Sequence, residues 1–417
     1  MNSFHPLALS DQLMAGVDAL GWEQPTAVQQ QAIPVVAAGS DLAAQAQTGS
    51  GKTAAFALPI LQRLSAHPSP PTAFALVVVP TRELALQVAA AFTALARFMA
   101  SPPGVVAVIG GQPIEQQIAD ISGGTPVVVA TPGRLLDLLQ RQELVLDDLH
   151  TLVLDEADKL LDLGFADELQ QLMSQLPAQH QSLLFSATLP AKVLALAKSV
   201  LHDPVEVRIE SDKAWPTEID QRAYQVDADK RRGLLQHLLT NEAWARTLVF
   251  VATQRRAETL SAKLRRAGFG CSALHGGLDQ DSRIEVLRRF KARPIGILIA
   301  TDLAARGIDI PELSTVVNYD LPRSTQDYVH RIGRTGRAGE SGLAVSFIDH
   351  DSAHHFALIE KRGGVTIPRQ VVAGFELTGT APRKQKGGAP KKGKRMSKKD
   401  KLRAQARRAE QDEDDGR

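Results

Sequence analysis

Short apolar runs alternate with helical patterns along most of this chain, and this alternation is the strongest constraint on its fold. The first half predicts strands at 73–80, 105–110, 126–131, 151–155 and 182–186, and the second half predicts strands at 247–253, 271–275, 295–301, 315–319 and 343–348. Strands that alternate with helices form parallel sheets covered on both faces. Because ten strands would be large for one sheet, we expect two α/β domains with about five strands each.

A polar segment separates the two halves of the chain. Residues 209–218 contain a proline and show no hydrophobic period, so they are predicted to link a first domain at 1–208 to a second at 219–372. The composition of 373–417 cannot bury a core, and we expect a disordered basic C-terminal tail there.

The charge of the chain is unevenly distributed. Residues 380–417 hold 14 Lys and Arg against 6 Asp and Glu, a net charge of +8, while the remainder carries 34 basic and 40 acidic residues. A basic arm on a mildly acidic body is typical of a nucleic-acid contact. A tail that only increases solubility is the alternative.

Composition excludes several classes of protein. No run of eighteen apolar residues predicts a membrane span, and residues 1–6 lack the features of a secretory signal. A single cysteine, Cys271, excludes an internal disulfide framework and a cysteine zinc site. These features favour a cytoplasmic protein with no membrane partner.

A glycine-rich loop at 46–53, A-Q-T-G-S-G-K-T, follows the apolar residues 42–46 and precedes a helical stretch. Its glycines let backbone N–H groups point at phosphate oxygens, and a lysine and a hydroxyl follow for phosphate and Mg²⁺. Ala46 departs from the strict pattern, which has glycine there, so a plain strand-to-helix turn is the alternative. The predicted nucleotide-binding residues are Thr48, Gly49, Ser50, Gly51, Lys52 and Thr53.

Two carboxylates, Asp155 and Glu156, follow the predicted strand 151–155 in the tetrad D-E-A-D. Ligands of open α/β sheets bind at such strand ends. With the phosphate loop, these residues predict splitting of a nucleoside triphosphate, in which Asp155 and Thr53 bind Mg²⁺, partly through water, and Glu156 is the general base. An acidic N-cap of the following helix is the alternative.

With these motifs the chain resembles the DEAD-box ATP-dependent RNA helicases of superfamily 2, over roughly residues 4–368. Within that family it is most similar to the bacterial RhlE-type group, through general similarity and the short basic tail. The resemblance implies two tandem RecA-like domains, with ATP and Mg²⁺ as cofactors.

Three further motifs carry the resemblance. Residues 21–29 are similar to the family's Q motif, which implies that Gln29 reads adenine, that Trp22 stacks on the base and that Phe4 supports it. Residues 186–188 resemble its third motif, which implies that hydroxyls of Ser186 and Thr188 bond to the DEAD carboxylates. Residues 328–337 resemble motif six.

The resemblance assigns roles to the second domain. Arg334 and Arg337 would be arginine fingers, and His330 and Arg331 would couple to the first domain, whereas Asp309 would contact the ribose or γ-phosphate. A solvated or phosphate-binding arginine face is the alternative for these arginines.

Loops after predicted strands resemble the family's RNA-binding motifs, which contact phosphate and 2′-hydroxyl groups without reading sequence. In the first domain the RNA-binding residues would be Pro80, Thr81, Arg82, Gly110, Gly111, Thr131, Pro132, Gly133 and Arg134. In the second they would be Gly276, Arg283 and Thr301, with His275, Gln280 and Asp302 beside them.

The leading hypothesis is therefore an RNA-stimulated ATPase that unwinds short RNA duplexes locally and remodels ribonucleoproteins. The alternatives are an ATP-dependent RNA clamp with slow turnover and a DNA helicase. RNA is the expected partner, and proteins of ribosome assembly or RNA decay are further candidates.

Overall fold

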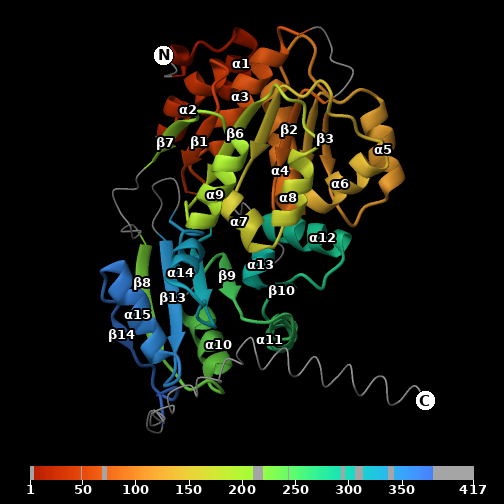
Figure 1. Ribbon diagram of the computed structural model, residues 1–417. Helices are drawn as coiled ribbons and strands as arrows, with labels where there is room; N and C mark the ends of the chain where they lie inside the picture. The colour runs from red at the N-terminus through yellow and green to blue at the C-terminus, as the bar shows by residue number, and fades with distance from the viewer. Residues whose placement is uncertain are drawn as a thin grey trace, which may run out of the picture. The chain divides into compact units, whose positions relative to one another are not determined.

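The computed structural model describes residues 4–47, 49–67, 73–209, 219–242, 244–292, 296–305, 313–336 and 342–378. The chain divides into a compact unit, Met1–Leu377, and Thr378–Arg417. The first unit contains two parallel sheets of seven strands each (Figure 1). The two α/β domains are therefore confirmed, but the expectation of five strands per sheet was wrong. Residues 210–218 of the predicted linker and 379–417 of the predicted tail lie outside the described residues.

The first sheet has the strand order β3-β4-β2-β5-β6-β1-β7. Its strands are β1 (Leu42–Gln45), β2 (Ala75–Val78), β3 (Val105–Val108), β4 (Val127–Ala130), β5 (Thr151–Leu154), β6 (Gln181–Ser186) and β7 (Val205–Arg208). The helices of this domain are η1 (His5–Leu7), α1 (Asp11–Ala19), α2 (Ala27–Ala37), α3 (Lys52–Leu64), α4 (Arg82–Ala96), α5 (Ile114–Ser122), α6 (Pro132–Gln140), α7 (Ala157–Asp162), α8 (Ala166–Met173) and α9 (Ala191–Val200).

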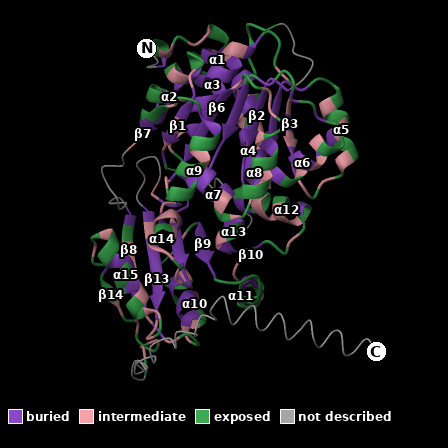
Figure 2. Ribbon diagram, in the orientation of Figure 1, coloured by how far each residue is buried: buried purple, intermediate pink, exposed green. Residues whose placement is uncertain are grey.

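The strands β2, β4, β5 and β6 of the first sheet are buried along their whole length (Figure 2). Side chains alternate along β2: Ala75 and Val77 enter a cluster with α2, α3 and α4, whereas Leu76 and Val78 enter one with α6, α8 and α9. Strands buried on both faces become the near-continuous apolar runs seen in the sequence.

The second sheet has the order β10-β11-β9-β12-β13-β8-β14. Its strands are β8 (Ile219–Gln225), β9 (Thr247–Phe250), β10 (Cys271–Leu274), β11 (Ile297–Ala300), β12 (Thr315–Asn318), β13 (Gly342–Ile348) and β14 (Arg369–Gln370). Its helices are α10 (Arg231–Asn241), α11 (Gln254–Arg266), α12 (Gln280–Lys291), α13 (Asp302–Ala305), α14 (Thr325–Ile332) and α15 (Ala353–Gly363).

The two sheets have the same topology. Each strand of the second sheet occupies the place of the strand seven earlier in the first, so β12 corresponds to β5 and β13 to β6. Alternation again separates two cores, since Val249 lies in one cluster and Leu248 with Phe250 in another. No helix of the described part of the chain is long and apolar enough to cross a membrane.

Candidate nucleotide and RNA site

Three predicted motifs meet at the carboxyl edge of the first sheet. Strands β5, β6 and β1 are neighbours, and Ser186 at the end of β6 pairs with Gln45 at the end of β1. The phosphate loop after β1, the D-E-A-D residues after β5 and Ser186 therefore share one edge, where ligands of parallel sheets bind.

The phosphate loop is shaped by two left-handed glycines. Gly49 and Gly51 have φ of 86° and 91°, and a Cβ on Gly51 would stand 2.4 Å from Nε2 of Gln29. Lys52 begins α3, is buried, and donates from Nζ to the carbonyl oxygen of Ala46 at 3.1 Å. Its Nζ lies 4.0 Å from Oδ1 of Asp155, which connects the loop to the acidic residues.

Gln29 links the Q motif to this loop. Its Oε1 accepts from the Thr26 N–H at 2.9 Å as part of a capping box, and its Nε2 donates to the carbonyl oxygen of Gly51 at 3.1 Å. Both ends of the amide thus have a protein partner, and each end keeps one further donor or acceptor for a ligand. Trp22 is half-buried against the first core, while Phe4 is fully buried within it and presents no face to a base.

The acidic pair at the end of β5 is held in an uncommon geometry. Glu156 has left-handed backbone angles, φ 52° and ψ 48°, which non-glycine residues rarely adopt. Its N–H donates to Oδ1 of Asp155 at 2.8 Å, and its Oε1 lies 2.7 Å from Nζ of Lys159. Asp155, Glu156 and Lys159 are all buried.

Burial and neighbouring charges separate the acidities of the two carboxyls. Burial, together with the adjacent Glu156 charge, raises the pKa of Asp155 to about 6 although Lys52 opposes this change. Burial also acts to raise the pKa of Glu156, but Lys159 and Lys52 outweigh it and hold that pKa below its ordinary value. Glu156 is therefore ionised at neutral pH, as a general base must be.

The third motif contacts the last acid of the tetrad. The Thr188 hydroxyl donates to Oδ2 of Asp158 at 2.9 Å, and Oγ of Ser186 accepts from the Asp158 N–H at 3.3 Å. The Ser186 hydroxyl in turn donates to the carbonyl oxygen of Thr188 at 2.6 Å. These bonds join β6 to α7 beside the nucleotide edge.

Arg331 of α14 bridges three strand ends of the second sheet. Its guanidinium forms two bonds to the Asp302 carboxylate, at 2.5 and 2.6 Å, and one to Oδ1 of Asn318 at 3.0 Å. It also lies over the Phe250 ring, 4.8 Å from its centroid. Motif six is thereby fixed to the carboxyl edge formed by β11, β9 and β12.

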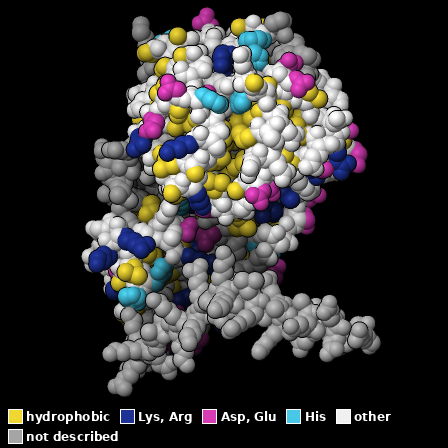
Figure 3. Space-filling view, in the orientation of Figure 1, with side chains coloured by type: hydrophobic (Ala, Val, Ile, Leu, Met, Phe, Trp, Pro, Cys, Tyr) yellow, Lys and Arg dark blue, Asp and Glu magenta, His cyan; other side chains and the backbone are white. Residues whose placement is uncertain are grey.

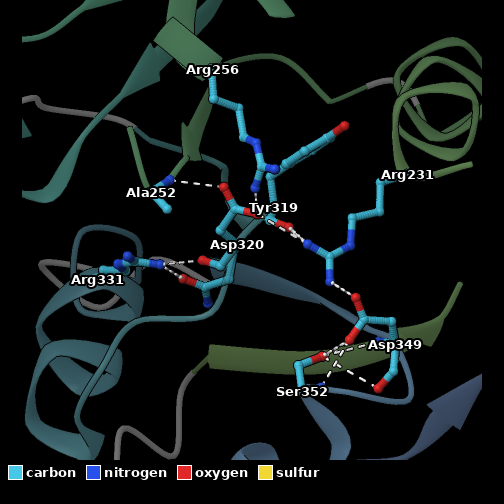
Figure 4. A network of polar contacts seen from close by, with 9 residues as sticks. Arg231, Ala252, Arg256, Tyr319, Asp320, Arg331, Asp349 and Ser352 are labelled. Carbon is cyan, nitrogen blue, oxygen red and sulfur yellow. Dashed lines mark hydrogen bonds and ion pairs between the residues drawn. The ribbon is translucent and has the colours of Figure 1, made fainter. Parts of the chain in front are cut away.

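Asp320 anchors the same helix through a wider network (Figure 4). Its carbonyl oxygen accepts from Arg331 at 2.6 Å, while its carboxylate accepts from Arg231 at 3.0 Å and Arg256 at 2.5 Å. Arg231 continues to Asp349 at 2.6 Å. The network thus joins α10, α11 and α14 to the ends of β12 and β13.

A small pocket joins residues of both domains. Lys159 of α7 faces residues of the second domain across it, and the pocket is lined by Lys159, Phe250, Asp302, Ala305, Asp327, His330, Arg331 and Arg334. Arg334 is buried, and its charge reaches Glu156 strongly enough to help lower the pKa of that carboxyl. Thr48, Asp309 and Arg337, also predicted for the nucleotide site, lie outside the described residues.

The predicted RNA loops occupy helix starts of the first domain. Thr81 caps α4 by accepting from the Leu84 N–H at 3.3 Å, and Thr131 precedes α6 with Pro132 in its first turn. Arg134 donates twice to the carbonyl oxygen of Gln112, at 3.2 and 3.1 Å.

The Arg82 guanidinium packs closely on Gly110 and Gly111. A Cβ on Gly111, whose φ is 83°, would stand 2.4 Å from Nη1 of Arg82. These two positions therefore need glycine to accommodate the arginine. Pro80, Thr301 and His275 are buried, Gly133 and Gly276 are exposed, and Gly110 is half-buried.

Two of the predicted RNA-binding arginines contact the other domain. Arg82 donates to Oε1 of Gln280 at 3.3 Å, and Nε of Arg283 donates to Oε1 of Glu83 at 2.6 Å. On the face shown in Figure 3, basic and acidic side chains of the described residues are interspersed.

The bond from Thr188 to Asp158 is of the kind expected between the third motif and the DEAD carboxylates. Sequence reasoning gave no role to two residues that the structure brings into the site, since Lys159 pairs with Glu156 and Glu83 pairs with Arg283. The spacing of Glu156 and Lys159, three residues apart at a helix start, was a usable signal. The sequence contained no signal for the role of Glu83, because its partner Arg283 is 200 residues away.

The residues present fit a nucleoside triphosphate with magnesium. Among the described residues the buried Ser50 hydroxyl finds no hydrogen-bond partner, as expected of a group that faces a phosphate oxygen. No cluster of three His, Cys, Asp or Glu in the described residues could hold a metal alone. Thr53 and Asp155 nevertheless suit Mg²⁺, which uses few protein ligands and keeps waters and substrate phosphates.

Comparison with known families and curated proteins gives a consistent result. The family described as "DEAD/DEAH box helicase" matches residues 26–196, and "Helicase conserved C-terminal domain" matches 229–339. The chain is 39% identical over 365 residues to the DEAD-box ATP-dependent RNA helicase CshA of Geobacillus kaustophilus, covering 87% of this chain and 77% of the relative. It is also 39% identical over 346 residues to CshA of Bacillus subtilis, covering 83% and 69%.

Solved structures of similar fold include helicases with RNA. Dbp5 of S. cerevisiae bound to RNA and ADP BeF3 matches with a TM-score of 0.79 and 31% identity, covering 89% of this chain and 96% of that one. The DEAD-box helicase Mss116 bound to ssRNA and UDP-BeF matches with a TM-score of 0.79 and 28% identity, covering 87% and 78%. The two parallel sheets are thus RecA-like domains, and this chain belongs to the DEAD-box family of ATP-dependent RNA helicases.

Proposed function

We propose that this helicase separates short RNA duplexes locally, without long-range translocation, in a cycle driven by ATP binding and hydrolysis. The observation that supports this most is the division of the nucleotide site. Lys52 and Glu156 belong to the first domain, whereas Arg334 belongs to the second. Hydrolysis would therefore need both domains together, and RNA that lies across both would favour that arrangement.

In this proposal each nucleotide-site residue has one task. Lys52 meets the β- and γ-phosphates, and Glu156 accepts the proton of the attacking water. Arg334, with Arg337, stabilises charge on the transferred phosphoryl group, an effect of roughly 10³–10⁵ in rate for an arginine finger. Thr53 and Asp155 would hold Mg²⁺, which supplies charge neutralisation at the phosphates.

RNA would lie against the strand-end loops of both domains. Helix-start N–H groups near Thr81 and Thr131 suit phosphodiester oxygens. The contacts of Arg82 with Gln280 and of Arg283 with Glu83 join these loops across the domains. RNA binding and domain closure would therefore support each other, and loss of phosphate after hydrolysis would release the RNA.

Finer assignments are proposals as well. Residues 380–417 would add sequence-independent affinity for RNA. The first domain would span 1–208 and the second 219–372, with a linker at 209–218 and a tail at 373–417. A cytoplasmic location fits the single cysteine. Ribosome-assembly or RNA-decay proteins are candidate partners. Placement in the RhlE-type group stays a prediction, because the relatives reported above carry the name CshA.

A strand-separation assay with a short RNA duplex tests this function. We expect separation that requires ATP, declines steeply with duplex length and disappears in Glu156→Gln. A clamp would instead hold RNA for long times in ATP without separating strands. Equal stimulation of the ATPase by deoxyribo- and ribo-oligonucleotides would indicate the DNA-helicase alternative.

A further inference from the structure

Lys159 makes a buried ion pair with the carboxylate proposed as the general base. Its Nζ lies 2.7 Å from Oε1 of Glu156, and the two side chains are 6% and 4% exposed. Among the described residues, Glu156 is the one carboxylate within ion-pair distance of this ammonium. The pair is short and almost excluded from water, so the charge of Lys159 limits where the Glu156 carboxylate can lie.

The surroundings make Lys159 a costly residue for stability alone. On its other side lies the pocket that also contains His330, Arg331 and Arg334, and Arg331 already occupies the Asp302 carboxylate. Burying an ammonium beside other cations is unfavourable, and an apolar side chain of similar size often serves a buried site as well or better. A lysine at this position is therefore best explained by its ion pair with Glu156.

The backbone of Glu156 does not by itself fix the orientation of its side chain, so contacts of the carboxylate must contribute to that orientation. It lies outside α7, in the left-handed region, with its N–H on Asp155. Lys159 is on the first turn of α7, and its own N–H donates to the carbonyl oxygen of Glu156 at 2.9 Å. Backbone and side-chain contacts thus tie Lys159 to Glu156 from one rigid element.

We propose that Lys159 is a positioning residue that holds the Glu156 carboxylate at the nucleotide edge of the first sheet, ready to receive the proton of the attacking water. This inference rests on the proposed role of Glu156. A displacement of about 1 Å in a catalytic group can cost roughly 100-fold in rate, so an anchored carboxylate matters for turnover more than for binding.

Lys159→Met tests the proposal by steady-state ATPase with saturating RNA. We expect kcat to fall roughly 10- to 100-fold while KM for ATP stays within about twofold. Lys159→Arg, which keeps a long cation, should recover most of the rate. Lys192→Met is the matched control, because Lys192 forms an exposed ion pair with Asp162 of the same α7, and it should leave the ATPase unchanged.

Thermal unfolding and binding of a non-hydrolysable ATP analogue separate positioning from folding. If Lys159→Met lowers the unfolding temperature but leaves kcat unchanged, the pair is structural and the proposal is wrong. A higher kcat would also contradict the proposal. So would an affinity for the ATP analogue that falls as much as kcat does. Single-turnover measurements can detect the small residual hydrolysis of Glu156→Gln, and adding Lys159→Met should change that residual rate by less than about twofold, since residues that act as a unit are not additive. Normal turnover in Glu156→Gln would refute the role of Glu156 as general base. That result can be told apart from a failure of the Lys159 proposal alone, in which Glu156→Gln is inactive but Lys159→Met keeps its kcat.

Discussion

The Glu83 carboxylate on α4 and the Arg283 guanidinium on α12 form a 2.6 Å ion pair between the two RecA-like domains. The side chains are only 6% and 12% exposed, so the pair is largely shielded from water. Both residues lie in the first turns of helices whose starts resemble RNA-binding motifs. The pair would therefore connect the proposed RNA-binding surface to the arrangement of the two domains.

Breaking this pair should weaken RNA-dependent activity more than nucleotide binding. Removing one partner leaves the other charge buried and uncompensated. We expect Glu83→Ala and Arg283→Ala each to reduce RNA-stimulated ATPase and strand separation, with a coupling energy of roughly 0.5–3 kcal/mol in the double-mutant cycle. Arg141→Ala, which removes an exposed pair with Asp137 on α6, is the control. Strictly additive effects would show that the pair does not couple the domains.

Lys52→Ala should abolish tight ATP binding. The buried Nζ of Lys52 is held toward Ala46 and Asp155, where it would meet the triphosphate. Fluorescent ATP titration with excess Mg²⁺ measures the loss. Retained micromolar affinity would sink the assignment of 46–53 as the phosphate loop.

The stability of the protein should depend on pH through His330. Burial, and then the Lys159 charge, lower the pKa of His330 below its ordinary value. The unfolded chain therefore binds a proton more readily, and the native state loses stability as pH falls through about 6.5. Denaturant unfolding between about pH 7.5 and about pH 5.5 should show a smaller loss for His330→Gln than for wild type. An equal loss in both proteins would contradict the prediction.

Deleting 380–417 should weaken RNA binding and flatten its salt dependence. Each phosphate neutralised by a lysine or arginine adds to the slope of log affinity against log salt. Basal ATPase should be unchanged, because the predicted nucleotide-site residues precede the tail. Affinity measured over a range of salt concentrations decides this, and an unaltered slope would favour a solubilising tail.

The sequence predicts the central strands well and the peripheral ones poorly. All ten predicted strands exist, since strands covered on both faces are apolar throughout. The strand β7, Val205–Arg208, was missed because three of its four residues are exposed, and β8, Ile219–Gln225, because half its residues are polar. Polar or exposed side chains remove the apolar signal on which strand prediction depends, at the sheet edge for β7 and next to the short edge strand β14 for β8.

The site is predictable where spacing alone fixes chemistry. The phosphate loop follows β1 and the D-E-A-D acids follow β5, on either side of β6, and parallel topology brings them to one edge. The bond of Thr188 to Asp158 follows the expectation that the third motif contacts the DEAD carboxylates, whereas the partners of Arg331 were not predicted, because they depend on side-chain directions across elements far apart in the chain. The contacts of the Gln29 amide with Thr26 and Gly51 were not foreseen from the sequence, and its role in reading adenine stays a prediction.

Steady-state ATPase with and without generic single-stranded RNA tests the central claim most directly, with Glu156→Gln as the control. We predict strong stimulation by RNA in the wild type and no turnover in Glu156→Gln, which should still bind ATP and RNA. Hydrolysis that is indifferent to RNA, or that persists in Glu156→Gln, would contradict an RNA-gated motor whose catalytic carboxylate is Glu156.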